Sequence, residues 1–385
     1  MNEAKVKVLE MLKDGKISVE ESMKLLQQIP DRQHNHEHEY EHVHEHEYEH
    51  DHQHQGHQHD HRQNSKPNPN FDFDFDFDFD FDFDFDFPNI IMDAIRGGWR
   101  KHKFDFNYSS DPVNQAITSI KLSGKNAPVI VKAHDLDFIK ISGTYTSKYP
   151  NAGINANVSN DVVEISYNQN AIRSLQILCE VPHVLIERLH VENKNSSIDI
   201  NDIRAKNAFL MTKNAKITLD KLECHDLIAK SRNAPVFANY VKSEDVFLET
   251  SNAKIDASGI QSHSIKLSSS NAGIKAENLD FRQLSINTSN AGLSLHNIMG
   301  SQWDDQTREL EIHTSNGGIT LNLPENVGHE IHASSSLSKI NCKLDNMQFD
   351  NTSQNHISGK SHNFEQFARK CKTNISTSNG SINIL

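Results

Sequence analysis

Apolar and polar residues alternate in short runs along the C-terminal part of the chain, and the alternation returns every nineteen residues. Each run has only three to five residues, with apolar side chains at every second position, which is typical of a strand that buries one face. A fixed period of about twenty residues is typical of a solenoid, whose coils stack one on another. Runs this short cannot form a helix pair. The pattern therefore predicts a mainly β fold, a single-chain β-solenoid of roughly 19-residue coils.

One asparagine begins the repeated phrase in each coil, as in Ser251-Asn252-Ala253-Lys254-Ile255. Asn tolerates left-handed backbone angles and bonds to its own turn, so we expect it at a corner of the coil. Stacking at about 4.8 Å would let these side chains form a ladder of amide hydrogen bonds. The alternative is a polar stripe that binds a glycan or a wall polymer. The expected structural ladder consists of Asn195, Asn214, Asn233, Asn252, Asn271 and Asn290.

Weaker forms of the same phrase begin at Asn126 and Asn151 and return at Asn316 and Asn379. Their spacing is irregular, as expected of terminal coils that carry insertions and caps. The solenoid domain is therefore predicted to span residues 113–385.

Two short amphipathic helices are predicted within residues 1–30. Gly15 stops the first helix, and Ser18 with Glu21 forms a capping box for the second. A helical hairpin of this size has too little core to be stable alone. We therefore expect residues 1–30 to self-associate or to dock on a protein partner or a membrane.

The segment Lys5–Ser22, which contains Lys13-Asp14-Gly15-Lys16-Ile17-Ser18, resembles the short helical N-terminal module of the YvlB/LiaX group of bacterial proteins. The Asn-rich β-repeat behind it resembles the putative-adhesin family of β-strand-repeat proteins, domain of unknown function 4097. These resemblances imply association with the cell envelope and, for LiaX-like members, a role in the response to antimicrobial peptides. They imply no catalytic residue. The two tracts that follow depart from the family pattern.

A His-rich acidic tract, in which His alternates mostly with Glu, Gln or Asp, dominates residues 31–70, which we predict to be a disordered linker. Neutral imidazole is a common ligand for nickel, zinc and copper. Binding would be loose, would involve many sites, and would be lost below about pH 6 as the imidazoles protonate. The alternative is a solvated linker without a metal function, and no cofactor is required. The candidate metal ligands are His34, His36, His38, His42, His44, His46, His50, His52, His54, His57, His59 and His61.

A strict Phe-Asp alternation runs from Phe71 to Phe87, within a tract of residues 71–88. As a strand it would place every Phe on one face and every Asp on the other. Three interpretations remain open: a disordered sticky linker, a strand laid against the first coil as a cap, or a face that contacts lipid or a partner.

Residues 89–112 form a segment that leads into the solenoid. From Asn89 to Lys103, apolar residues share one helical face, and a basic end with one Trp follows Gly97-Gly98. This composition suits an interfacial amphipathic helix near anionic lipid, while the alternative, which we favour, is a helix that caps the solenoid core.

The formal charge of −13 is concentrated in residues 31–88, where 17 acidic residues stand against three basic ones. The solenoid is therefore near neutral and has no basic face for nucleic acid. Its four cysteines form no CxxC pair, which suits a reducing compartment better than a disulfide framework or zinc site. No signal peptide and no run of 18 apolar residues is present, so we expect a cytoplasmic protein, with peripheral envelope association left open.

Catalysis has little support in the sequence. Solenoid enzymes that cleave polysaccharides need clustered carboxylates or basic residues on one face, and the outward columns here repeat no acidic pair. The best candidate site lies in the insertion that interrupts the period, although an exposed loop explains it equally well: Trp303, Asp304, Asp305, Glu309 and Glu311. We therefore predict a non-enzymatic, envelope-associated binding or scaffold protein, for which the response to envelope stress is one expected setting. The alternative is a metal-buffering or metal-sensing protein that acts through the His-rich tract.

Overall fold

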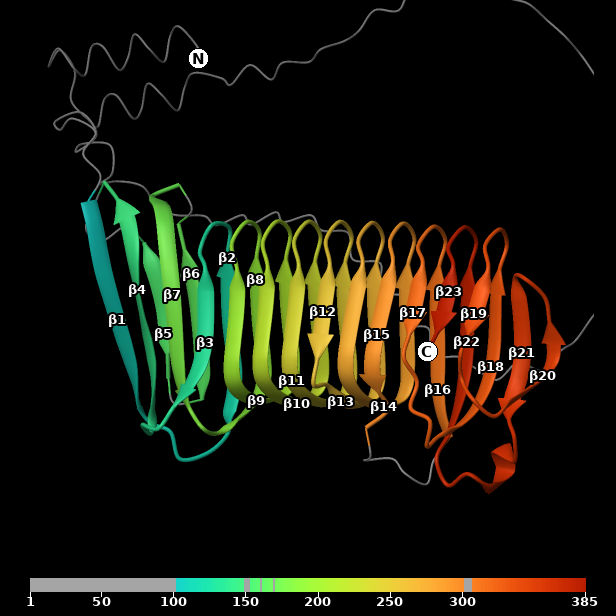
Figure 1. Ribbon diagram of the computed structural model, residues 1–385. Helices are drawn as coiled ribbons and strands as arrows, with labels where there is room; N and C mark the ends of the chain where they lie inside the picture. The colour runs from blue at the N-terminus through green and yellow to red at the C-terminus, as the bar shows by residue number, and fades with distance from the viewer. Residues whose placement is uncertain (1–101, 149–152, 160, 169, 301–306) are drawn as a thin grey trace, which may run out of the picture. The chain divides into compact units, whose positions relative to one another are not determined.

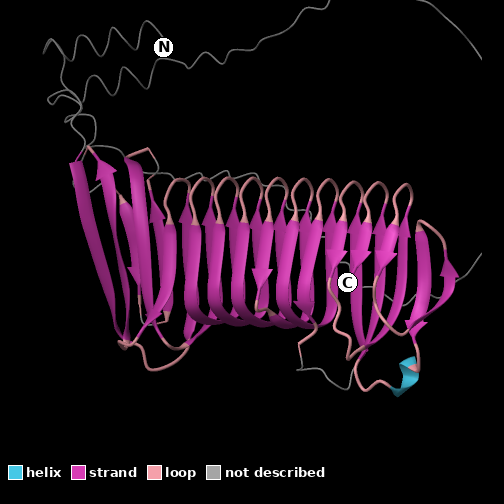
Figure 2. Ribbon diagram, in the orientation of Figure 1, coloured by secondary structure: helices cyan, strands magenta, loops and turns pink. Residues whose placement is uncertain are grey.

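The computed structural model describes residues 102–148, 153–159, 161–168, 170–300 and 307–385. The predicted helical hairpin, the His-rich linker and the Phe-Asp tract lie outside these residues. Strands β1 to β23 of the described chain join into one continuous sheet that winds along a stack of coils (Figures 1 and 2). The one helical element among the described residues is a 3-10 turn, η1 (Phe364–Gln366). The mainly β solenoid predicted from the sequence is confirmed.

The middle of the stack repeats with the predicted period. Neighbouring strands are parallel and in register, so that Ile217 lies beside Ile198 on one side and Val236 on the other. All three side chains are fully buried, and burial of one such side chain contributes about 1.5–3 kcal/mol. Residues of one column therefore share one environment. The strands of this region are β8 (Leu185–Asn193), β9 (Ile198–Thr212), β10 (Ile217–Ser231), β11 (Val236–Thr250), β12 (Ile255–Ser258), β13 (Gln261–Ser269), β14 (Ile274–Thr288) and β15 (Leu293–Ile298).

Most of these strands are longer than the sequence runs suggested. β9, β10, β11 and β14 each have 15 residues, because two apolar runs join through a bend without losing the pairing to neighbouring coils. The opposite corners of the coils form a row of loops along one edge of the stack (Figure 1).

At the N-terminal end, the order of strands in space departs from their order in the chain. The first coil, β2 and β3, stacks directly on β8 and β9. The intervening chain folds back outside it, so that β6 pairs with β2, while β7 pairs with β3 and with β4, and β4 pairs with β1. The strands are β1 (His102–Pro112), β2 (Ile117–Gly124), β3 (Val129–His134), β4 (Phe138–Ser147), β5 (Ile154–Val158), β6 (Val162–Tyr167) and β7 (Ile172–Pro182).

The C-terminal end is also reordered. The last coil in sequence, β22 and β23, lies between the coil of β16 and β17 and the coil of β18 and β19. Antiparallel strands β21 and β20 then close the stack. The strands are β16 (Thr307–Thr314), β17 (Ile319–Leu321), β18 (Gly328–Ser335), β19 (Ile340–Cys342), β20 (Met347–Thr352), β21 (His356–Ser361), β22 (Lys370–Thr377) and β23 (Ile382–Ile384).

The part of the entry segment that the structure describes is a strand. Residues 102–112 form β1, which follows the Gly97-Gly98 pair expected to end the predicted helix. The alternation of Phe104, Phe106 and Tyr108 with polar residues explains the strand, because it places three aromatic rings on one face. Residues 89–101 lie outside the described chain.

Candidate binding surfaces

The repeated asparagines form one ladder along the loop edge of the solenoid. Each side-chain Nδ2 donates a hydrogen bond to Oδ1 of the Asn in the preceding coil, over distances of 2.6 to 2.8 Å. The ladder includes three irregular positions as well as the regular ones, so it extends into both reordered ends. Its members, in spatial order, are Asn126, Asn195, Asn214, Asn233, Asn252, Asn271, Asn290, Asn316 and Asn379.

A second column, of buried hydroxyl groups, closes the same corners and was missed by sequence reasoning. Thr250 Oγ1, two residues before Asn252, donates to the carbonyl of Ala234 in the preceding coil over 3.2 Å. In several coils the same hydroxyl oxygen also accepts a bond from the backbone N–H three residues on, as Ser231 does from Ala234. The signal was present as a Ser or Thr at this position in every regular coil from Thr212 to Thr288.

The left-handed backbone predicted for the ladder asparagines is instead found on the opposite edge. No ladder Asn has a positive φ, whereas φ is 55° at Asp202 and Lys221, 53° at Tyr240 and 65° at Gly259. Asn278 and Asn297 continue this row. The prediction was wrong because side-chain pairing along the stack, and not the backbone conformation, explains the Asn column.

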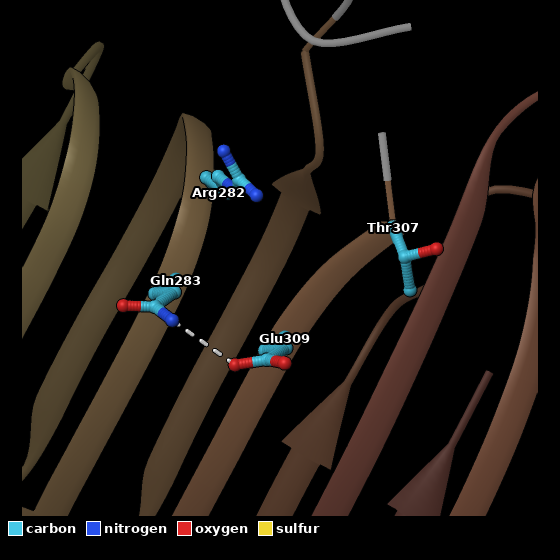
Figure 3. Close-up of a pocket in the computed structure, with 4 residues that line it drawn as sticks. All are labelled: Arg282, Gln283, Thr307 and Glu309. Atoms are coloured by element: carbon cyan, nitrogen blue, oxygen red, sulfur yellow. Dashed lines mark hydrogen bonds between the residues drawn. The ribbon is translucent and has the colours of Figure 1, made fainter. Parts of the chain in front are cut away.

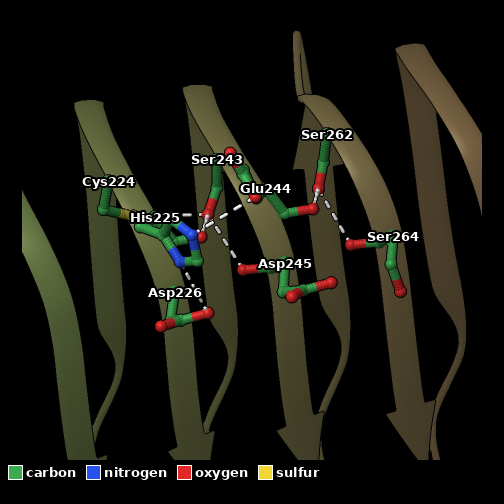
Figure 4. Close-up of polar contacts among 8 residues, drawn as sticks. All are labelled: Cys224, His225, Asp226, Ser243, Glu244, Asp245, Ser262 and Ser264. Atoms are coloured by element: carbon green, nitrogen blue, oxygen red, sulfur yellow. Dashed lines mark hydrogen bonds and ion pairs between the residues drawn. The ribbon is translucent and has the colours of Figure 1, made fainter.

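A charged ridge, formed by His225, Asp226, Glu244 and Asp245, runs along part of the solenoid (Figure 4). His225 lies between two carboxylates, with Nδ1 3.1 Å from Asp226 and Nε2 3.2 Å from Glu244. The hydrogen bond and charge of Asp226, followed by the charge of Glu244, raise the pKa of His225 above its usual value. Partial burial and the nearby Asp226 also raise the pKa of the Asp245 carboxyl.

The buried hydroxyl groups of Ser243 and Ser262 form hydrogen bonds with the backbone of this ridge. The single hydroxyl proton of Ser243 is shared between the carbonyls of His225 and Asp245, and that of Ser262 between the carbonyls of Glu244 and Ser264 (Figure 4). These bonds stabilise the bend in these two coils. Across residues 102–385, excluding the undescribed gaps, no group of three His, Cys, Asp or Glu side chains has the arrangement of a metal site.

A shallow polar pocket of about 390 Å³ lies beside the insertion that interrupts the period (Figure 3). Arg282, Gln283, Thr307 and Glu309 line it, and Gln283 Nε2 donates to Glu309 over 3.1 Å. Of the predicted site residues of the insertion, Glu309 is thus in the pocket. Glu311 is exposed on the same face of β16. Trp303, Asp304 and Asp305 lie outside the described residues.

Two arginines hold the chain at the point where this insertion begins. Arg308 is fully buried, and its Nε donates to the Phe281 carbonyl, while its Nη2 donates to Gly300 and pairs with Asp280. Arg369 donates to the same Gly300 carbonyl over 2.7 Å. These arginines stabilise the interrupted coil. Arg308 was not recognised from the sequence because it occupies an inward position where an apolar residue is expected.

One outer face carries apolar side chains on successive coils. We define the aromatic face as the in-register column Phe209, Ile228, Phe247, together with Lys230 and Lys266. Phe209 is 37% exposed. The ammonium groups of Lys230 and Lys266 lie 4.8 Å and 5.3 Å from the centre of the Phe247 ring, where cation–π attraction holds them.

The four cysteines, all within described residues, are free thiols. Burial raises the pKa of Cys179 and of Cys371 to about 12, and raises that of Cys224 to about 11. Such thiols stay protonated at neutral pH and are poor nucleophiles.

Two segments to which the sequence analysis assigned functions lie outside the residues that the structure describes. The twelve histidines between His34 and His61 lie outside the described residues, and so does the hairpin of residues 1–30. In the described part of the chain, no helix has the length and apolar character that a membrane crossing requires.

Comparison with solved structures finds several neighbours at low identity. A putative cell adhesion protein from Clostridium sporogenes is 9% identical, with 74% of this chain and 99% of that chain covered and a TM-score of 0.21. A putative adhesin from Parabacteroides merdae is 11% identical, with 75% and 98% covered and a TM-score of 0.36. A putative adhesin from Parabacteroides distasonis is 9% identical, with 74% and 97% covered and a TM-score of 0.33.

A search of curated proteins finds no match. A family model does match, and it spans residues 117–385, from the first coil to the end of the chain. The ladder, the stacked coils and this match lead to one assignment: the chain belongs to the Toastrack DUF4097 family.

Proposed function

We propose that this protein is a non-enzymatic interaction protein of the cell envelope, and that its solenoid binds a partner through the aromatic face. The observation that supports this most directly is an apolar column on successive coils, in which Phe209 is exposed and Ile228 and Phe247 are half-buried. Aromatic side chains are enriched where proteins bind other molecules, because they bury a large apolar area at low entropic cost.

The rigidity of the stack suits such a surface. Coils held about 4.8 Å apart by strand pairing and by the Asn ladder present the column at a fixed spacing. A partner with a repeating structure would meet several coils at once. Lys266 adds positive charge beside the Phe247 ring, whereas the charge of Lys230 is balanced by Glu249 at 3.0 Å. The chemistry therefore fits an extended, anionic polymer with apolar sugar faces, such as a wall glycan.

A non-enzymatic role is supported by how the polar groups of the solenoid are used. His225, Asp226 and Glu244 pair with one another along the ridge, and among the described residues that line the pocket of Figure 3, Glu309 is the one carboxylate. Hydrolysis of a glycoside by the usual route needs two carboxyl groups that flank the bond.

Binding to isolated cell walls and to purified anionic wall polymer tests the proposal. The double variant Phe209→Ala/Phe247→Ala should lower affinity by about tenfold, since two partly exposed aromatic contacts are lost. Thr218→Ala, on a different outward column of β10, is the matched control and should bind as the parent chain does. Equal affinities for all three proteins would show that the aromatic face is not the binding surface.

We further propose that residues 1–30 self-associate or dock on a partner, and that the protein acts in the response to envelope stress or antimicrobial peptides. Light scattering on the full chain and on a chain without residues 1–30 tests the first point. If both are monomers at physiological concentration, the hairpin does not mediate association. Cell fractionation before and after treatment with an antimicrobial peptide tests the second, and an unchanged abundance and location would contradict it.

The metal-binding alternative rests on the His-rich tract and stays a prediction. Calorimetric titration with nickel and with zinc should show several weak sites in the full chain and none after deletion of residues 34–61. Tight binding at a defined stoichiometry would favour a metal-sensing role over a scaffold role.

A further inference from the structure

The N-terminal end of the described solenoid leaves its core incompletely covered. Two strands form the border there, since β1 pairs only with β4, and β5 pairs only with β6, among the described strands. The Phe106 ring lies over Gly143 of β4 and has its centre 6.0 Å from that of Tyr108. The inward residues of both border strands are only half-buried: Phe104, Phe106, Tyr108, Ile154, Ala156 and Val158.

The C-terminal end is different. Its border strand β20 has a bulge between Phe349 and Asn351, which leaves Asp350 without a register partner. Bulges and charges on a border strand are common devices that prevent pairing with another chain. β1 has no such bulge over His102–Ser109, where its register with β4 is unbroken.

We propose that the N-terminal end of the solenoid pairs with the same end of a second copy, through antiparallel β1–β1 and β5–β5 contacts. Strand pairing at an open border is a general mode of recognition, and a twofold axis makes the same surface serve both copies. This inference is independent of the aromatic face and of residues 1–30.

The order of aromatic and polar side chains in β1 is nearly the same in both directions from Phe106. An antiparallel register centred there places Phe106 opposite its own copy and Phe104 opposite Tyr108, so every ring meets a ring. On the polar face, Asp105 lies opposite Asn107, and Lys103 lies opposite Ser109. Aromatic cross-strand pairs are favourable, and no carboxylate directly faces another.

β5 has the same symmetry about Ala156. Ile154 would lie opposite Val158, and Asn155 opposite Asn157. An antiparallel β5–β5 pair therefore continues both an apolar face and an Asn face.

Phe106 and Ala156, the central residues of the two proposed strand pairs, lie at similar distances from the loop edge. Through the paired strands, Phe106 is level with Gly143, Ile177 and then Val129. Ala156 is level with Ile165 and then Leu122. Val129 follows the corner residue Asn126 by three positions, and Leu122 precedes it by four. One twofold axis between the copies can thus serve both strand pairs.

A strand of strict Phe-Asp alternation, such as residues 71–87 of another copy, suits this border less well. Every register that matches Phe with the rings of β1 puts an Asp directly opposite Asp105. Like charges in directly opposed positions are destabilising. The second copy's β1 offers Asn107 at this position.

Sedimentation equilibrium of the full chain with substitutions at exposed Asn107 tests the proposal. Asn107→Asp would place a carboxylate opposite Asp105, twice by symmetry, and should weaken dimerisation by about tenfold. Asn107→Lys would create two opposite-charge pairs and should strengthen it. Asn351→Asp, the same change on the border strand β20, is the control and should have no effect.

Several outcomes would overturn the proposal. A parent chain that stays monomeric at high concentration excludes it. Equal dimer affinities for the Asn107→Asp and Asn107→Lys variants would exclude this register. Loss of dimerisation on deletion of residues 71–87 would identify the Phe-Asp tract as the pairing strand instead. If deletion of residues 1–30 abolishes association and neither substitution at Asn107 changes the affinity, the dimer contact lies in the hairpin. Dimerisation that survives both deletions and responds to these substitutions supports the proposal.

Discussion

The chain turns once per coil on each of the two long edges of the solenoid, and different interactions stabilise the two turns. On the loop edge, nine asparagines form a continuous ladder, and each amide bonds to the next one along the stack. On the opposite edge, the shared feature is a left-handed backbone, and the residues that adopt it are as unlike as Asp202, Lys221 and Tyr240. Only Asn278 and Asn297 of this row, among the described residues, also pair through their side-chain amides.

The difference shows what makes a column uniform in a repeat protein. An amide that both donates to and accepts from its neighbours at a fixed distance favours the same side chain in every coil. A left-handed φ requires only that the cost, about 1–2 kcal/mol for a residue with a Cβ, is met by the surrounding structure. Uniform columns therefore indicate side-chain pairing, and variable columns indicate backbone geometry.

The largest effect is expected where the loop edge is most closely packed. A Cβ added to the buried Gly317 would lie 1.8 Å from the Ala291 carbonyl oxygen, so Gly317→Ala must displace the backbone of two coils. We expect a loss of about 3 kcal/mol in the free energy of unfolding, measured by urea denaturation. Gly318→Ala is the control, because its Cβ would meet nothing closer than 3.5 Å. Equal urea midpoints for the two variants would show that the corner at Gly317 is not closely packed.

The next effect concerns Gly259, the one glycine in the left-handed row. Gly259→Ala combines a φ of 65° with a Cβ 3.1 Å from the Tyr240 ring. We expect it to destabilise the protein by about 1–2 kcal/mol. In a Tyr240→Ala background, the cost should fall to the conformational part alone. If it does not fall, the ring contact contributes nothing.

Removing one step of the ladder should cost about 1 kcal/mol, since the site is exposed to water. Asn252 donates to Asn233 over 2.7 Å and accepts from Asn271 over 2.8 Å, and Asn252→Ala removes both bonds. Asn239→Ala, in a neighbouring coil but outside the ladder, is the control. The ladder interpretation fails if thermal denaturation gives the same melting temperature for both.

The same Lys→Gly substitution should change the free energy of unfolding in opposite directions on the two edges. Lys221→Gly relieves a left-handed φ and should stabilise the fold by about 0.5 kcal/mol. Lys213→Gly, at a loop-edge position with ordinary φ, should destabilise it by a similar amount because glycine is more flexible when unfolded. Chemical denaturation of both variants checks this, and equal signs would refute the distinction between the edges.

The smallest effect is expected on the charged ridge and depends on pH. The carboxylates Asp226 and Glu244 raise the pKa of His225 in the folded state. The resulting stabilisation is fully present below the unfolded pKa and is lost as pH rises through the higher, folded pKa. Against His225→Gln, the parent chain should be more stable at about pH 5.5 and equal at about pH 8.5. A difference that grows with pH would contradict the pairing.

The sequence predicted the solenoid and its buried columns because the signal is local and repeated. Ile198, Ile217 and Val236 each stand three residues after an Asn, and the same environment recurs in all six regularly spaced coils. The candidate site in the insertion was predicted only in part: Glu309 lines the pocket, while Arg282 and Gln283 belong to β14, in the coil before the insertion, and no local pattern joins them to it.

By itself, the sequence determined the period, the strand alternation, the buried columns and the Asn of each coil, since each depends on residues within one repeat. The tertiary structure decided what depends on neighbours distant in the chain. It placed β22 and β23 between coils that precede them in sequence, set β2 and β3 against β8 and β9, and buried Arg308 beside Asp280. It also assigned the left-handed turn to the edge opposite the asparagines. The physical reason is that backbone pairing between strands accepts many residue types, so the order of coils leaves little trace in a local pattern.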